Sequence, residues 1–128
     1  MKDYLDQRKI KYKDFGTNNE ESVDASDFAV KVAKKVRQNK INRGILICGS
    51  GIMMSMAANK IKGARAALVW NPKIAKQARE HNDVNILALS GRESKPKHWK
   101  KIIDVFLKTS ALKKERYKKR INKLDKIK

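Results

Sequence analysis

The sequence of 128 residues contains one cysteine, two prolines and only 13 acidic residues. A single cysteine cannot form an internal disulfide, and it excludes a metal site built on paired cysteines. No window approaches the roughly 18 uninterrupted apolar residues of a membrane-spanning helix, and no signal peptide is visible. These absences favour the reducing cytoplasm. Because the length and an apolar content of 41% suffice for one modest core, we expect a single domain over residues 1–128.

Basic residues are in large excess, because Lys and Arg together number 32 and give a net charge of +19. The most basic segment is 113–128, which we expect to form a helix. Such a charge would attract nucleic acid or another polyanion. The lysines are spread along the chain, however. A surface that binds the phosphates of a nucleic acid usually has its basic residues clustered and is rich in Arg. Polyanion binding therefore stays the weaker hypothesis.

Segments typical of strands and of helices alternate along the chain. Short apolar runs and residue alternation predict strands at 10–15, 44–48, 64–70 and 84–89. Helical spacing of apolar residues predicts the end of a helix at 1–9 and further helices at 28–36 (capped by Asp27), 52–61, 72–80, 97–107 and 113–128. The segments 17–26 and 81–83 are predicted loops. This order predicts a three-layer α/β/α fold with a parallel, Rossmann-like sheet, whose ligands bind at the carboxyl ends of the strands.

One glycine-rich turn, Cys48-Gly49-Ser50-Gly51, follows a predicted strand and precedes a predicted helix. The first backbone amides of a helix have no helical partner, and the helix dipole adds partial positive charge, so an anion or a developing oxyanion is stabilised there. The same field favours a thiolate, which can serve as a base or a nucleophile. The alternative, that Cys48 is a small buried core residue, is equally open at this point.

Two other polar features could bind a ligand. His81 and Asn82 could donate and accept hydrogen bonds at a sugar hydroxyl. An equally good interpretation is that His81 is a solvent-exposed loop residue that binds no ligand. Arg116 and Arg120 are four residues apart and share a helix face, which suits a phosphate but also fits an ordinary charged surface.

Four stretches together resemble the ribose-5-phosphate isomerase B family, whose superfamily includes the galactose-6-phosphate isomerase subunits. They are Gly44-Ile45-Leu46-Ile47-Cys48-Gly49-Ser50-Gly51, Ser55-Met56-Ala57-Ala58-Asn59-Lys60, Arg65-Ala66-Ala67 and Arg79-Glu80-His81-Asn82-Asp83-Val84-Asn85. The resemblance covers nearly the whole chain.

The resemblance implies an aldose–ketose isomerase of the pentose phosphate pathway, which interconverts ribose 5-phosphate and ribulose 5-phosphate through an enediolate without metal or organic cofactor. Its catalytic residues would be Cys48 as the base, Ser50 beside it, and His81 for opening the sugar ring. The residues that bind the enediolate, the substrate or its phosphate would be Gly49, Gly51, Ile52, Met53, Asn82, Arg92, Arg116 and Arg120. The family also implies a homodimer with active sites shared between the two copies.

The chain departs from the family pattern in four places. The family begins with a strand that ends in an Asp-His pair and lies inside the sheet beside segment 10–15. That strand is absent here, so we expect an N-terminally truncated domain with unpaired backbone groups and a gap in the core. Met53 replaces a glycine, Tyr117 replaces a histidine, and Ala25-Ser26 replaces Tyr-Pro. Two alternatives therefore stand beside an active pentose-phosphate enzyme: a catalytically impaired member, and a galactose-6-phosphate isomerase subunit.

Overall fold

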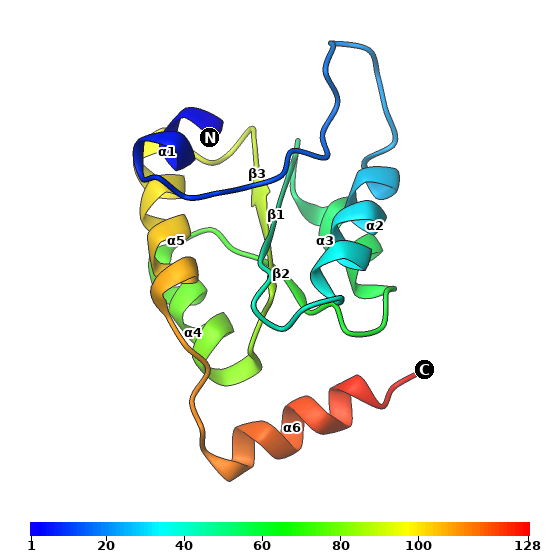
Figure 1. The fold of residues 1–128 in the computed structure, drawn as a ribbon, viewed down its shortest axis with the longest axis vertical. Helices are drawn as coiled ribbons and strands as arrows, with labels where there is room; N and C mark the ends of the chain where they lie inside the picture. Colours follow the sequence, from blue (N-terminus) through cyan, green and yellow to red (C-terminus); the bar gives the residue numbers. More distant parts are fainter.

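The computed structural model describes residues 1–128 and contains three parallel strands between two layers of helices (Figure 1). The strands are β1 (Gly44–Cys48), β2 (Ala66–Leu68) and β3 (Ile86–Ser90), in the sheet order β1-β3-β2. This arrangement confirms the predicted three-layer fold with a parallel sheet. None of the helices has both the length and the apolar character that crossing a membrane requires.

The helices form two layers and a separate C-terminal element. One face of the sheet is covered by α2 (Ala25–Val36) and α3 (Ile52–Asn59). The other face is covered by α1 (Lys2–Gln7), α4 (Pro72–Asn82) and α5 (Pro96–Lys108). The last helix, α6 (Glu115–Asp125), lies beyond the amino ends of the strands, at the bottom of Figure 1.

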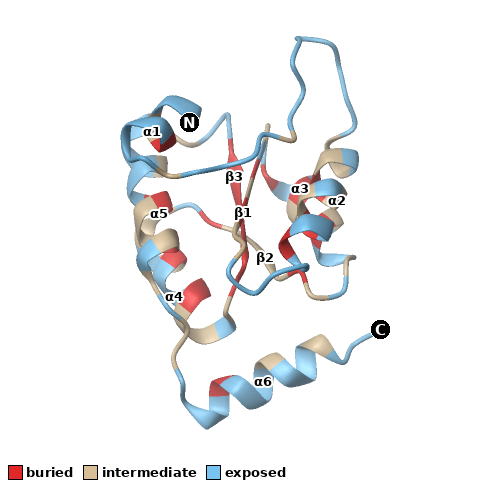
Figure 2. Ribbon diagram, viewed as in Figure 1, coloured by how far each residue is buried: buried red, intermediate tan, exposed pale blue.

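The central strand β3 organises the core. All five of its residues are buried, as Figure 2 shows, because it pairs with a strand on each side and carries helices on both faces. Successive side chains of a strand point to opposite faces. Leu87 and Leu89 accordingly join the cluster under α1, α4 and α5, whereas Ile86 and Ala88 join the cluster under α2 and α3. Burial on both faces explains the uninterrupted apolar run of this strand.

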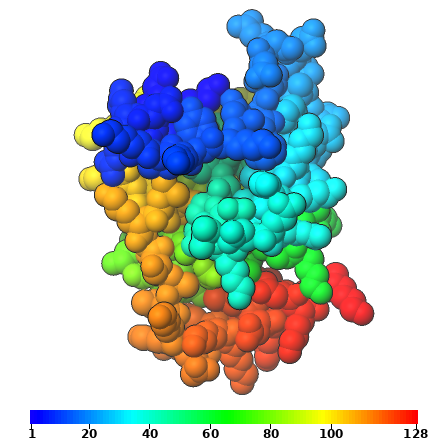
Figure 3. All heavy atoms as spheres, viewed as in Figure 1, coloured from blue at the N-terminus to red at the C-terminus, as the bar shows by residue number.

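The predicted strand at 10–15 is wrong. The segment has no strand partner, and neither the N–H nor the C=O groups of residues 11–15 form a backbone hydrogen bond. The physical reason is a cavity of about 740 Å³, with this segment on one wall and β1 on the other. Figure 3 shows the segment in blue, lying across this face of the molecule between α5 and α2.

Other boundaries also differ from the predictions. Asp24, rather than Asp27, precedes α2, and Asp27 lies in its first turn. His81 and Asn82 belong to the last turn of α4 instead of a loop, because the helix continues until Asp83 adopts a left-handed backbone with φ of 45°. The strand predicted at 64–70 shrinks to Ala66–Leu68, the three residues that lie in parallel register with β3.

The free edge of β1 yields a testable prediction. The Gly44 N–H donates to the Asn85 carbonyl at 2.9 Å, and the Cys48 carbonyl accepts from the Gly91 N–H at 2.8 Å, so residues 44, 46 and 48 face β3. Ile45 and Ile47 therefore direct their backbone groups toward the cavity. We expect their amides to exchange with deuterium at least about tenfold faster than the Leu46 amide in an NMR exchange experiment. Equal protection of all three amides would contradict the open edge.

Candidate active site

Cys48 is the last residue of β1 and is half-buried, four residues before Ile52, the first residue of α3. The Gly51 N–H donates to its sulfur with an N···Sγ distance of 3.1 Å. Gly51 has a φ of +79°, and a Cβ on it would lie 2.6 Å from Cδ1 of Leu68. The turn therefore requires glycine at this position, and that requirement holds the sulfur at the head of α3.

Other backbone donors belong to the same turn. The Ile52 N–H donates to Ser50 Oγ at 3.2 Å, while the N–H groups of Gly49, Ser50 and Met53 have no acceptor within the chain. Free amides at a helix start can hold an oxyanion, and their partial charge also favours a nearby anion. The turn therefore places the Cys48 sulfur beside amide donors that could hold a developing negative charge.

Met53 fits the turn without backbone strain. Only Lys9 and Asp83 have positive φ among the non-glycine residues, so Met53 has ordinary helical geometry. Its side chain is 54% exposed and points away from the core. The replacement of the family's glycine thus does not distort the backbone that carries the amides.

Two residues at the carboxyl end of β3, Ser90 within the strand and Arg92 after it, complete this group. The Arg92 guanidinium lies so close to Gly49 that a Cβ there would be 2.7 Å from Cζ of Arg92. Ser90 donates from Oγ to the Gly49 carbonyl at 2.7 Å and accepts from the Glu93 N–H at 3.0 Å. The sequence analysis did not identify Ser90 as a site residue. The signal that could have indicated it is a polar residue at the end of an apolar strand, directly before a glycine. We call Cys48–Met53 with Ser90 and Arg92 the turn group.

The remaining predicted residues form a second group at the other end of the sheet. His81 and Asn82 lie in the last turn of α4, while Arg116 and Arg120 lie on the exposed surface of α6. The two elements touch through the rings of His81 and Tyr117, which are stacked with centroids 4.7 Å apart and planes 9° apart. We call His81, Asn82, Arg116 and Arg120 the helix group.

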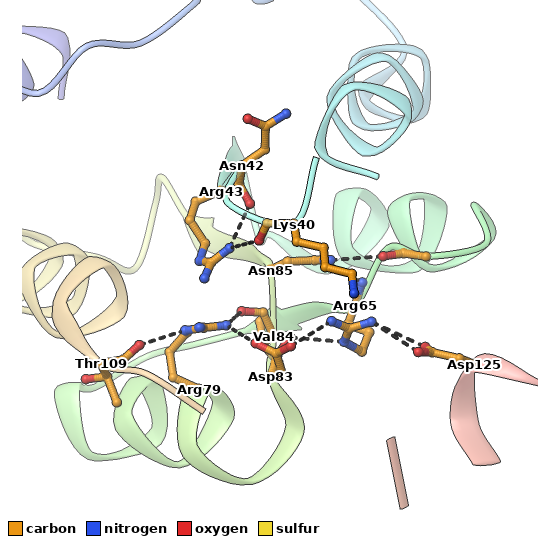
Figure 4. Close-up of polar contacts among 11 residues, drawn as sticks. Lys40, Asn42, Arg43, Arg65, Arg79, Asp83, Val84, Asn85, Thr109 and Asp125 are labelled. Carbon is orange, nitrogen blue, oxygen red and sulfur yellow. Dashed lines mark hydrogen bonds and ion pairs between the residues drawn. The ribbon is translucent and has the colours of Figure 1, made fainter. Parts of the chain in front are cut away.

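An ionic network holds α6 beside the end of α4 (Figure 4). Asp83 accepts from Arg79 Nη1 at 2.8 Å and from Arg65 Nη2 at 3.0 Å. Arg65 also pairs with Asp125 of α6 at 3.3 Å. The network therefore connects Arg65, just before β2, with the end of α4 and with α6. Sequence reasoning assigned it no role, because its members come together only in the fold.

The buried arginines of this region have their charges satisfied. Arg79 is only 2% exposed, and besides Asp83 it donates to the carbonyls of Val84 and Thr109. Burial lowers the pKa of the nearby Arg43 guanidinium, and the positive charge of Arg79 adds to that effect. Arg43 donates to the backbone carbonyls of Lys40 and Asn42, in the turn that precedes β1.

The turn group and the helix group do not meet within one chain. Cys48 pairs with Ser90 at the carboxyl end of β3, whereas His81 precedes the amino end of the same strand. Five residues of parallel strand separate these ends by about 13 Å. The cavity beside β1 is lined by neither group.

The sequence is similar to those of known sugar-phosphate isomerases. The model of the Ribose/Galactose Isomerase family matches residues 1–124. The putative sugar phosphate isomerase YwlF of Bacillus subtilis is 46% identical over 110 residues, which are 85% of this chain and 74% of that protein. The probable ribose-5-phosphate isomerase B of Mycoplasma pneumoniae is 40% identical over 122 residues, 94% of this chain and 80% of that protein.

Solved structures agree closely with the fold. The crystal structure of a ribose 5-phosphate isomerase from Thermotoga maritima has a TM-score of 0.93 and 44% identity, over 98% of this chain and 86% of that chain. The ribose-5-phosphate isomerase B from Mycoplasma genitalium, with bound ribulose-5-phosphate, has a TM-score of 0.89 and 41% identity, over 96% of this chain and 82% of that chain. The family match, the sequence identity and the shared fold together establish that this chain belongs to the Ribose/Galactose Isomerase family as a member of its ribose-5-phosphate isomerase B group.

Proposed function

We propose that the chain interconverts ribose 5-phosphate and ribulose 5-phosphate through an enediolate. The observation that carries the proposal is the Cys48 sulfur, held by the Gly51 amide at the head of α3 beside amides that have no acceptor. A group that moves a proton between two carbons, next to donors for the oxygen that becomes negative, is what such an isomerisation requires. The similar Mycoplasma genitalium enzyme binds ribulose-5-phosphate, which supports a pentose rather than a galactose substrate.

The proton transfers occur at the turn group. Cys48, as the thiolate, removes the proton from C2 of the open-chain aldose, and the carbonyl oxygen on C1 becomes the enediolate oxygen. The free N–H groups of Gly49 and Met53 stabilise that oxygen. The proton of the C2 hydroxyl moves to the C1 oxygen, and the exposed Ser50 hydroxyl is placed to relay it. Cys48 then returns its proton to C1, which gives the ketose and restores the thiolate.

Ring opening and phosphate binding belong to the helix group. His81 takes the proton of the anomeric hydroxyl and delivers a proton to the ring oxygen, which releases the open-chain aldehyde. Arg116 and Arg120 hold the phosphate together with Arg92 of the turn group, because guanidinium groups pair well with phosphate oxygens. Asn82 is exposed beside His81 and binds a sugar hydroxyl.

A complete site requires a second copy of the chain. One substrate cannot contact Cys48 and His81 of the same chain, since the length of β3 separates them. The surface beside the turn is apolar, because Ile52, Met53 and Met56 on α3 are 52%, 54% and 59% exposed. Contiguous exposed apolar residues mark association surfaces. A homodimer that covers this surface, and brings the partner's helix group to the turn group, satisfies both observations.

The first prediction concerns the base. Replacing Cys48 by Ala removes the proton-transferring sulfur, so turnover of ribose 5-phosphate should fall by at least about 100-fold. The substitution shortens a half-buried side chain, so the thermal midpoint should change little. A coupled assay of ribulose 5-phosphate formation and a melting curve measure the two effects. Substantial turnover by Cys48→Ala would contradict the proposed base, and absence of turnover by the parent chain would favour a catalytically impaired member.

The second prediction concerns the shared site. Cys48→Ala and His81→Ala, each inactive alone, should regain activity when mixed, unfolded and refolded together. Half of the dimers formed by random association are hybrids with one intact site, so the mixture should reach about a quarter of the parent activity.

Native mass spectrometry with one tagged chain verifies that hybrid dimers form. The matched control is each variant refolded alone at the same total concentration. Hybrids without recovered activity would show that Cys48 and His81 serve the same site from within a single chain.

A further inference from the structure

Tyr117 lies at the contact between α4 and α6, and it is the one buried residue of α6, with 8% of its surface exposed. Its ring is stacked nearly parallel on the imidazole of His81, at the 4.7 Å centroid distance given above. Parallel stacking restricts rotation of the imidazole about the bond that joins it to Cβ. The face of His81 toward α6 is therefore occupied, and its ring nitrogens point in fixed directions along the plane.

The same tyrosine also contacts an arginine of the helix group. Arg116 Nη2 donates to the Tyr117 hydroxyl at 3.0 Å. The Arg116 guanidinium carbon lies 4.8 Å from the centroid of the Tyr117 ring, within the range of a cation–π contact. The Tyr117 side chain thus contacts His81 through its ring and Arg116 through both its ring and its hydroxyl.

The position of Tyr117 is itself fixed from both ends of α6. Before the helix, the Leu112 N–H donates to the Glu80 carbonyl of α4 at 3.0 Å. At its end, Asp125 pairs with Arg65, which also pairs with Asp83 at the end of α4 (Figure 4). These contacts hold the Tyr117 ring against the last turn of α4.

We infer that Tyr117 is a positioning residue of the isomerase, whose ring sets the plane of the His81 imidazole for ring opening and whose hydroxyl places Arg116 for the substrate phosphate. This inference rests on the proposed function. Acid–base transfer to a sugar ring needs the imidazole nitrogens aligned with the anomeric hydroxyl and the ring oxygen, so a freely rotating imidazole is a poorer catalyst. Tyr117 itself contacts two residues of the site and no reacting atom.

The opening and closing of the sugar ring can be measured separately from proton transfer between C1 and C2. Ribulose 5-phosphate has no ring form, because the hydroxyl that would close a five-membered ring on its C2 carbonyl carries the phosphate. In D₂O, Cys48 can exchange a C1 proton of this ketose for deuterium without His81, whereas efficient formation of cyclic ribose 5-phosphate requires His81 as well. The ratio of C1 deuterium incorporation to isomerisation, followed by NMR, therefore isolates the step that Tyr117 supports.

Two substitutions separate the ring from the hydroxyl. Tyr117→Leu removes the stacked ring, so isomerisation should fall about tenfold, while the exchange-to-isomerisation ratio rises about tenfold. Tyr117→Phe keeps the ring and removes the hydroxyl, so kcat and the ratio should stay at parent values. The KM for ribulose 5-phosphate should then rise several-fold, because Arg116 loses a hydrogen bond.

A matched control and a structural measurement accompany these variants. Ile121→Ala alters a half-buried residue one turn further along α6, so it should lower the melting temperature and leave the ratio unchanged. The imidazole protons of His81 should be shifted upfield by the Tyr117 ring current in the parent chain and in Tyr117→Phe, and this shift should vanish in Tyr117→Leu. His98, the other histidine, is exposed and serves as the reference.

The outcomes distinguish this inference from the proposed function. A parent chain that neither isomerises nor exchanges would overturn both. An active parent whose ratio is the same in Tyr117→Leu would overturn only the positioning role, as would an Ile121→Ala variant that raises the ratio equally. Loss of kcat in Tyr117→Phe to the level of Tyr117→Leu would show that the ring stack is not what supports His81.

Discussion

The parallel pairing of β3 between β1 and β2 is the constraint from which the rest of the structure follows. Because β3 is paired on both sides and covered on both faces, its ends become the two places where loops and helix termini gather. Its carboxyl end meets the turn after β1, and its amino end follows the last turn of α4. A rigid strand therefore keeps the sulfur of Cys48 and the imidazole of His81 apart, and this separation makes a second copy part of the proposed chemistry.

At the amino end of the sheet, charge rather than apolar packing determines the arrangement. Burying the Arg79 guanidinium without a partner would cost several kcal/mol, so Asp83 and two carbonyls must surround it. The same carboxylate accepts from Arg65, which extends the network to Asp125 on α6. This basic helix carries one buried side chain, so these directional contacts define how it lies against α4. The network thereby fixes the relative positions of the residues in the helix group.

Local sequence patterns predicted elements best where burial alone determines them. The apolar run of β3 and the helical spacing of α5 gave the correct element types, because both are buried against neighbours on a regular period. The alternation in segment 10–15 predicted a strand that does not form. A strand needs a partner that supplies hydrogen bonds, and this segment faces a cavity where β1 would have to be adjacent. The sequence around His81 predicts a loop although the helix continues through it, because a left-handed residue such as Asp83 gives only a weak signal for the end of a helix.

The sequence by itself determined the parallel α/β fold, the glycine turn that carries Cys48, and the resemblance to a sugar-phosphate isomerase family. These properties reside in short runs of consecutive residues, whose periodicity and turn chemistry act locally. Only the tertiary structure decided which site residues share an end of the sheet, that Ser90 supports the Gly49 carbonyl, and that Tyr117 stacks on His81. Those contacts join residues far apart along the chain, and they depend on how helices and strands pack rather than on any local pattern.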